Sequence, residues 1–82
     1  MIKQEVLEKA LRLAINNSRE IHVVISDNKY EYVNDEEICY DENLHKPIAI
    51  TIYPDSAYEF PNRNHGILEK DKHGELYLNQ IS

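Results

Sequence analysis

The sequence predicts a single small α+β domain over residues 1–82, with an N-terminal amphipathic helix packed on a four- or five-stranded, mostly antiparallel sheet. Helical periodicity occurs only at the start of the chain, and alternating β-branched runs follow it. The chain is also too short to build more than one core. An amphipathic helix must bury its apolar face, and an Ile-rich antiparallel sheet is the partner that this chain offers.

Apolar residues recur at three- and four-residue spacing over residues 2–16, which predicts a helix with one wide apolar face. Glu5 and Lys9 add an acid-before-base pair at i,i+4, the favourable order on a helix. The run 16–18, Asn-Asn-Ser, contains poor helix formers, and asparagine tolerates the left-handed conformation that closes many helices. We therefore expect the helix to end near residue 16.

Three runs predict strands. Residues 21–25 and 29–33 flank Asp27-Asn28, two residues that tolerate positive φ, so the two runs are expected to form an antiparallel hairpin. Alternation places Tyr30 and Tyr32 on one face of the second strand, with Glu31 and Val33 on the other. The strongest strand covers residues 48–53, where every second residue is isoleucine and prolines bound the run at both ends.

The last third of the chain predicts a loop and a second hairpin. Residues 55–66 contain aromatic side chains and a proline that would confine any helix to about one turn, so we expect a loop. Residues 67–70 and 75–79 flank a turn in which Gly74 can adopt the left-handed conformation. The predicted core contains Val6, Leu7, Ala10, Leu11, Ala14, Val23, Ile25, Ile48, Ile50, Ile52, Leu76 and Leu78.

Negative charge is concentrated in residues 30–45, called the acidic segment below. The segment holds six Asp or Glu and no Lys or Arg. The rest of the chain carries nine acids and nine bases, so the segment accounts for the whole net charge of −6. Because no basic stripe is present to neutralise phosphates, the sequence disfavours direct binding of nucleic acid.

Residues typical of enzymes and metal sites occur without the spacing that their chemistry needs. Cys39 is the only cysteine, and the four histidines have no partner at a recognised ligand spacing. His65 and His73 could approach each other near Asp71, but exposed loop polarity is the simpler interpretation. The acidic clusters do not match a calcium-binding loop, and two glycines cannot make a phosphate-binding loop. We predict no enzymatic activity, no metal and no cofactor.

Tyrosines are interleaved with the carboxylates of the acidic segment. One interpretation is that the acids form a solvated edge that prevents strand-to-strand aggregation, while the tyrosines complete a small core. The other is a recognition surface, in which rigid tyrosines supply contact area and carboxylates steer and pair with a basic partner, mimicking a nucleic-acid backbone. The candidate partner-binding residues are Glu31, Asp35, Glu36, Glu37, Tyr40, Asp41 and Glu42.

In size, acidity and helix-then-sheet order, the chain is similar to several phage-encoded inhibitors of bacterial nucleic-acid enzymes, including uracil-DNA glycosylase inhibitors and anti-CRISPR proteins. The similarity is one of general features and no motif assigns the chain to a family. It implies a small protein that inhibits or regulates a basic protein partner. We expect this protein to be cytoplasmic, because residues 1–5 are too charged for a signal peptide and the single Cys39 fits a reducing compartment. The alternative is a structural or assembly module, such as a homodimer formed through a sheet edge or a tyrosine face. No apolar run is long enough to span a membrane.

Overall fold

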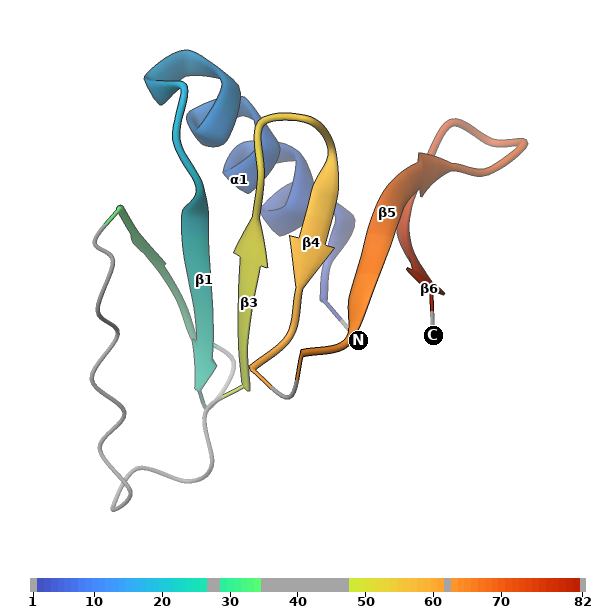
Figure 1. Cartoon of the computed structure of the whole chain (residues 1–82). Helices are drawn as coiled ribbons and strands as arrows, with labels where there is room; N and C mark the ends of the chain where they lie inside the picture. Colours follow the sequence, from blue (N-terminus) through green and yellow to red (C-terminus); the bar gives the residue numbers. More distant parts are fainter. Residues whose placement is uncertain (1, 27–28, 35–47, 62, 82) are drawn as a thin grey trace.

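The computed structural model describes residues 2–26, 29–34, 48–61 and 63–81 (Figure 1). Within these ranges the chain forms one helix and a six-stranded antiparallel sheet with the order β2-β1-β3-β4-β5-β6. The predicted α+β class is confirmed. The elements are α1 (Gln4–Asn17), β1 (Ile21–Ser26), β2 (Lys29–Val33), β3 (Ile48–Ile52), β4 (Ala57–Glu59), β5 (His65–Lys70) and β6 (Leu76–Ile81).

The sheet has more strands than predicted because β4 forms inside the expected aromatic loop. Ala57, Tyr58 and Glu59 are too few to show a period of two in the sequence. The structure pairs them with β3 on one side and β5 on the other. The side chain of Tyr58 points into the core and is 1% exposed, and its burial stabilises this short strand between its two neighbours.

Helix α1 ends at Asn17, one residue beyond the predicted end, and the left-handed conformation is adopted by Ser18 (φ 52°) and not by an asparagine. The Ser18 and Arg19 amides donate hydrogen bonds to the carbonyl oxygens of Ile15 and Ala14, which satisfies two of the acceptors that a helix end leaves free. The helix begins two residues later than predicted because Lys3 is extended (φ −64°, ψ 143°) and occupies the N-cap position.

The core lies between α1 and the facing side of the sheet. Most predicted core residues are confirmed as buried, and Leu11, Ile25, Leu76 and Leu78 are partly buried against them. The side chain of Ile48 lies outside the described part of the structure. The structure adds Ile21, Tyr58 and Leu68 to the predicted cluster under the helix, and it also buries Ala49 on the other side of the sheet. Tyr58 and Leu68 come from strands with little periodicity of their own. The buried cluster is Val6, Leu7, Ala10, Ala14, Ile21, Val23, Ile50, Ile52, Tyr58 and Leu68.

The predicted second hairpin is confirmed as β5 and β6. Its turn is closed by Asp71, whose Oδ1 accepts hydrogen bonds from the backbone N–H groups of His73 (2.8 Å) and Glu75 (3.0 Å). Gly74 adopts φ 78°, the left-handed conformation that glycine tolerates at no steric cost.

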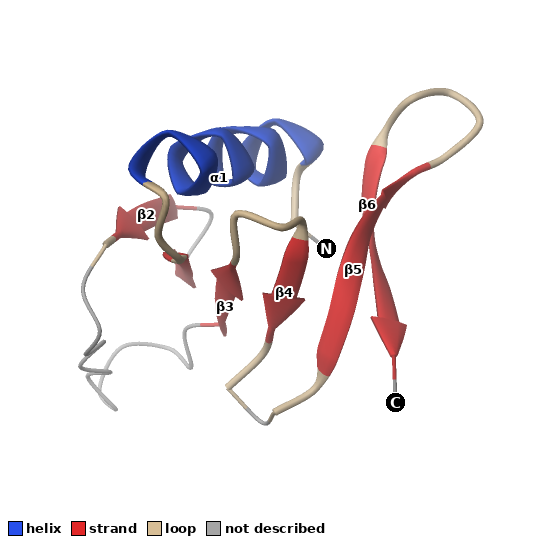
Figure 2. Cartoon of the chain, turned by 45° about the horizontal axis from the view of Figure 1, so that its top comes forward, coloured by secondary structure: helices blue, strands red, loops and turns tan. Residues whose placement is uncertain are grey.

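All of the described helix lies on one side of the sheet (Figure 2). Helix α1 contacts β1, β3 and the edge strand β6, so the sheet bends around it. The two layers leave the opposite side of the sheet without a covering helix among the described residues. In the same residues, α1 is too short and too polar to span a bilayer.

Candidate functional site

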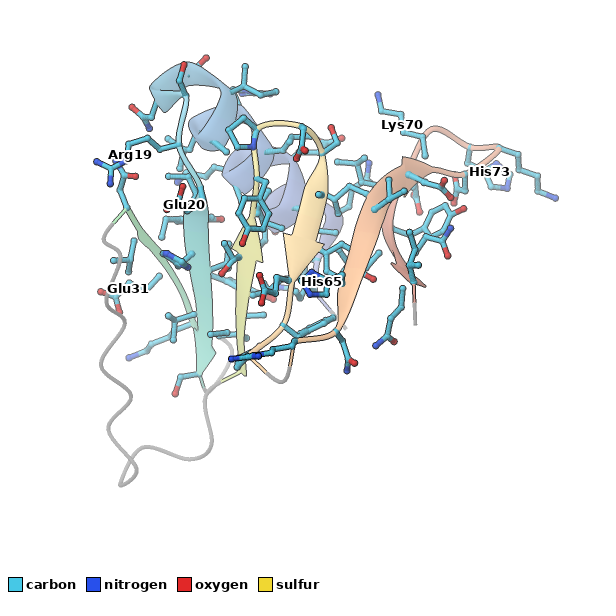
Figure 3. The ribbon with its side chains drawn as sticks, viewed as in Figure 1. Arg19, Glu20, Glu31, His65, Lys70 and His73 are labelled. Atoms are coloured by element: carbon cyan, nitrogen blue, oxygen red, sulfur yellow. The ribbon has the colours of Figure 1, made fainter. Side chains whose placement is uncertain are left out.

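The side of the sheet that faces away from α1, called the open face below, has no helix over it among the described residues (Figure 2). It lies in front of the helix in Figure 3. Residues directly opposite in an antiparallel ladder share a face, so the register identifies its side chains. Each of the six strands places at least one side chain on this face. Taken one from each strand, in sheet order from β2 to β6, these side chains are Glu31, His22, Thr51, Glu59, Ile67 and Tyr77.

Glu31 is the predicted partner-binding residue that the structure describes. It is exposed on β2, opposite Val24 of β1, and lies on the open face (Figure 3). The predicted separation of Glu31 from Tyr30 and Tyr32 is therefore confirmed. The remaining predicted site residues, Asp35, Glu36, Glu37, Tyr40, Asp41 and Glu42, lie outside the described residues.

Tyr30 and Tyr32 pack against α1 and not on the open face. Both contact the buried cluster. The Lys9 ammonium lies 4.8 Å from the centre of the Tyr32 ring, and the Lys3 ammonium lies 6.0 Å from that of Tyr30. Burial raises the pKa of Tyr32, and the nearby Glu5 carboxylate raises it further. These two tyrosines hold the helix to the sheet, as the core interpretation of the sequence expects.

A tyrosine–carboxylate pair lies at the centre of the open face. The Tyr53 hydroxyl donates a hydrogen bond to Oε2 of Glu59 at 2.9 Å. Burial raises the pKa of Tyr53, as do its hydrogen bond to Glu59 and the nearby carboxylates of Glu20 and Asp55. Three carboxylates therefore surround one phenol that keeps its proton, which makes this part of the face both aromatic and acidic.

The turn between β3 and β4 positions this pair. Pro54 cannot extend the β3 ladder, so the chain turns back there. The amide of Ser56 donates to the Tyr53 carbonyl oxygen (3.1 Å), and the Tyr53 amide donates to that of Ala57 (3.0 Å). Oδ1 of Asp55 accepts a hydrogen bond from the Ala57 amide (3.3 Å). These bonds turn the chain back so that Glu59 lies beside β3, opposite Thr51, where its carboxylate reaches the Tyr53 hydroxyl.

His22 and Thr51 form a second polar pair beside Tyr53. They are opposite each other in the β1–β3 ladder, and Nδ1 of His22 is hydrogen-bonded to Oγ1 of Thr51 at 2.8 Å. With Tyr53, Glu59, Phe60 and other neighbours they line a pocket of about 250 Å³. Within the described residues Glu59 bonds to Tyr53 and does not orient His22, so the arrangement lacks the third group of a nucleophilic triad. Its polar groups suit hydrogen bonding to a bound surface.

A third group lies on the outer part of the open face. The Tyr77 hydroxyl and the Asn79 side-chain amide donate hydrogen bonds to Oε2 of Glu69, at 3.0 and 2.9 Å. The bond to Glu69 raises the pKa of Tyr77, and Asp71 adds to the effect. The open face thus carries two tyrosines, each hydrogen-bonded to a carboxylate: Tyr53 directly after the inner strand β3, and Tyr77 on the edge strand β6.

The two histidines considered for a metal site do not come together. His65 begins β5, whereas His73 lies in the turn at the far end of the same hairpin (Figure 3). Across the described ranges, no group of three or more His, Cys, Asp or Glu side chains is arranged to hold a metal ion. Cys39 lies outside those ranges.

The Tyr53–Glu59 and Tyr77–Glu69 pairs were missed by sequence reasoning. Charge counting favoured the residues around position 36, because carboxylates are dense there. In contrast, the residues directly before and after Glu59 and Glu69 are neutral or basic. Pairing could have been inferred for Tyr77 and Glu69, since a hairpin with its turn at 71–74 places them opposite each other. No comparable signal existed for Tyr53, because β4 was not predicted.

No protein-family model matches this chain, and no curated protein or solved structure is significantly similar to it.

Proposed function

We propose that this chain is a small binding protein that inhibits or regulates a basic protein partner, of the kind that processes nucleic acids. The acidic segment and the adjoining open face would form the contact surface. The observation that carries the proposal is the open face itself, on which Tyr53 and Tyr77 are each held by a carboxylate and face away from the helix.

Tyrosines and carboxylates have complementary roles in such a surface. A tyrosine offers a large, amphipathic contact area with few rotatable bonds, and its hydrogen bond to glutamate reduces the freedom it would lose on binding. Carboxylates attract a basic partner at a distance and pair with its Lys or Arg side chains on contact. A chain with a net charge of −6 favours such an encounter.

Glu31 connects the acidic segment to the open face. It lies within the segment by sequence and on the open face by structure. We therefore extend the proposed contact surface from Glu31 to the carboxylates that follow it in the sequence. Carboxylates spaced along a strand and the adjoining chain could resemble a nucleic-acid backbone, which gives a reason for a nucleic-acid-processing enzyme as the partner.

The proposal is tested by capturing partners from a lysate of the native host with tagged protein, at salt concentrations from about 50 mM to about 300 mM, where screening of exposed charges becomes strong. Mass spectrometry identifies the bound proteins. The expected result is a basic nucleic-acid-processing protein whose retention falls as salt rises.

A charge-reversal variant, Glu36→Lys with Glu37→Lys, should abolish this retention. The matched control, Glu5→Lys with Glu75→Lys, makes the same change in net charge at exposed positions outside the acidic segment. The acidic-surface mechanism is wrong if both double variants retain the partner equally and with the same salt dependence.

A further inference from the structure

Exposed apolar side chains gather around β6, an edge strand of the sheet. Among the described residues the exposed large hydrophobic side chains are Ile15 (53%), Ile67 (41%), Tyr77 (42%) and Ile81 (52%). Tyr77 and Ile81 lie on β6 and Ile67 on the neighbouring strand, all on the open face. Ile15 lies on α1, on the other side of the sheet. Exposed apolar side chains therefore lie on both sides of this one edge.

On the helix side of the edge, a pocket of about 320 Å³ lies between α1 and the β5–β6 hairpin, which stand side by side in Figure 2. Its apolar lining is formed by Leu11 and Ile15 of the helix and by Leu76 of β6. Charged side chains of both signs, Glu8, Arg12 and Lys70, complete its lining. The pocket therefore combines an apolar wall with charges that can pair with either sign.

Within the described residues, β6 lacks the usual features that protect a sheet edge. The residues of β6 include no charged side chain and no proline, and no described strand lies beyond β6 in the sheet. Charged side chains and proline are the usual protection of an edge strand against pairing with another chain. The opposite edge, β2, carries Lys29 and Glu31, so the two edges of this sheet differ in the feature that controls association.

We propose that the β6 edge binds the β6 edge of a second copy of this chain, as an antiparallel pair about a two-fold axis perpendicular to the sheet. An antiparallel strand pair is self-complementary under such an axis. If Leu78 lies opposite the same residue of the second copy, leucines meet on the helix side. On the open face, Tyr77 then meets the Asn79 position. The pairing joins two sheets into one through main-chain hydrogen bonds.

The charge of the chain selects this edge for contact with another copy. Two chains of −6 repel each other most where their acidic segments approach, because those segments carry the net charge. Pairing along Leu76–Ile81 brings no like charges opposite each other, because none are present. The neighbouring pocket carries both positive side chains (Arg12 and Lys70) and a negative one (Glu8). The pocket rims of two copies can therefore lie near each other with opposite charges adjacent. A basic partner would instead favour the carboxylates, so this proposal stands apart from the proposed function.

Sedimentation velocity from about 5 µM to about 500 µM covers dissociation constants in the micromolar range. The expected result is a species of twice the 9.7 kDa chain mass, increasing with concentration. Asn79→Lys places two lysines close together across the axis and should weaken dimerisation by about tenfold or more. Asn34→Lys, at an exposed position after β2, is the matched control and should dimerise as the wild type does. A single-chain mass throughout the range, or equal dimerisation by all three proteins, would overturn the proposal.

Amide hydrogen exchange of the wild type gives a second measurement that does not depend on a variant. Dilution should speed exchange in β6 and leave β2 unchanged, because only the β6 edge gains partners in the dimer. Equal concentration dependence at both edges, or none at either, contradicts the assignment. Salt separates the dimer from partner binding: screening from about 50 mM to about 300 mM should strengthen a dimer of like-charged chains, whereas it should weaken binding of a basic partner.

Discussion

The ring of Tyr58 lies over Gly66, its direct partner across the β4–β5 ladder, in the space that a side chain at position 66 would occupy. An aromatic side chain packed over a strand glycine shields a backbone that would otherwise be open to water. The ring also makes an edge-to-face contact with Phe60, with centroids 5.5 Å apart. This arrangement joins the inner half of the sheet to the outer hairpin.

Gly66→Ala should destabilise the fold by about 2–3 kcal/mol, a typical cost of forcing extra atoms into a packed core. A Cβ at position 66 would overlap the Tyr58 ring, so the ring or the strand must shift. Urea denaturation followed by circular dichroism measures the change. In a Tyr58→Leu background the same substitution should cost less than in the wild type. Strictly additive effects of the two substitutions would contradict the packing relationship.

Tyr58→Phe should leave stability unchanged or raise it by about 1 kcal/mol, because a buried hydroxyl without a partner costs free energy. The Tyr58 hydroxyl is buried and makes no hydrogen bond with the described residues. The control is Tyr53→Phe, which removes the bond to Glu59 and should not stabilise the fold. A loss of more than about 1 kcal/mol for Tyr58→Phe would indicate that the hydroxyl has a partner.

Stability should fall as the pH rises above about 10, the ordinary pKa of tyrosine. Burial raises the pKa of Tyr58 in the folded state. Below pH 10 the phenol is protonated in both states, so its contribution is fully present. Above pH 10 the phenol ionises in the unfolded chain before it ionises in the folded one. Its contribution to stability is therefore lost as the pH rises through the folded-state pKa. Urea titrations between about pH 8 and about pH 11 should show a shallower decline for Tyr58→Phe than for the wild type.

Ser18→Gly should stabilise the fold by about 0.5–1 kcal/mol, because the residue that ends α1 adopts a left-handed conformation that favours glycine. Thermal unfolding measures the gain. Ser26→Gly is the matched control: it introduces glycine into β1, where added backbone entropy should destabilise the fold. If both variants shift in the same direction, the conformation of Ser18 does not control the helix end.

Tyr53→Ala should weaken binding of the captured basic partner by about tenfold, the usual effect of truncating a central interface tyrosine. Lys9→Ala is the control, since Lys9 lies on the helix side, over Tyr32. Affinity is measured by titration at constant salt, after circular dichroism has shown that both variants fold. Unchanged affinity for Tyr53→Ala would remove the open face from the proposed contact surface.

Periodicity was sufficient to predict the elements that repeat a pattern long enough to detect. The helix, the first hairpin and the separation of Glu31 from Tyr30 and Tyr32 all follow from it, and the structure confirms them. β4 could not be predicted, because a three-residue strand is decided by its neighbours: Tyr58 finds Ile52 on one side and Gly66 on the other.

The candidate site was predicted less completely than the fold. Charge density along the chain identified the acidic segment, and of its predicted contact residues the structure describes Glu31. The density of carboxylates along the sequence could not identify a single glutamate whose hydrogen-bond partner lies several residues away. Glu69 meets Tyr77 across a hairpin, and Glu59 meets Tyr53 across a turn that ends in an unpredicted strand.

The strand order gives the acidic segment an unusual freedom to evolve. Its residues 34–45 come between β2 and β3 in the sequence, and these two strands sit on either side of β1 and do not pair with each other. Every other connection between consecutive strands joins partners whose register the connection helps to set. Insertions, deletions and substitutions between Val33 and Ile48 should therefore leave the pairs between the six described strands in place. Natural variation among descendants of this chain should concentrate there, which would let one scaffold follow a changing partner.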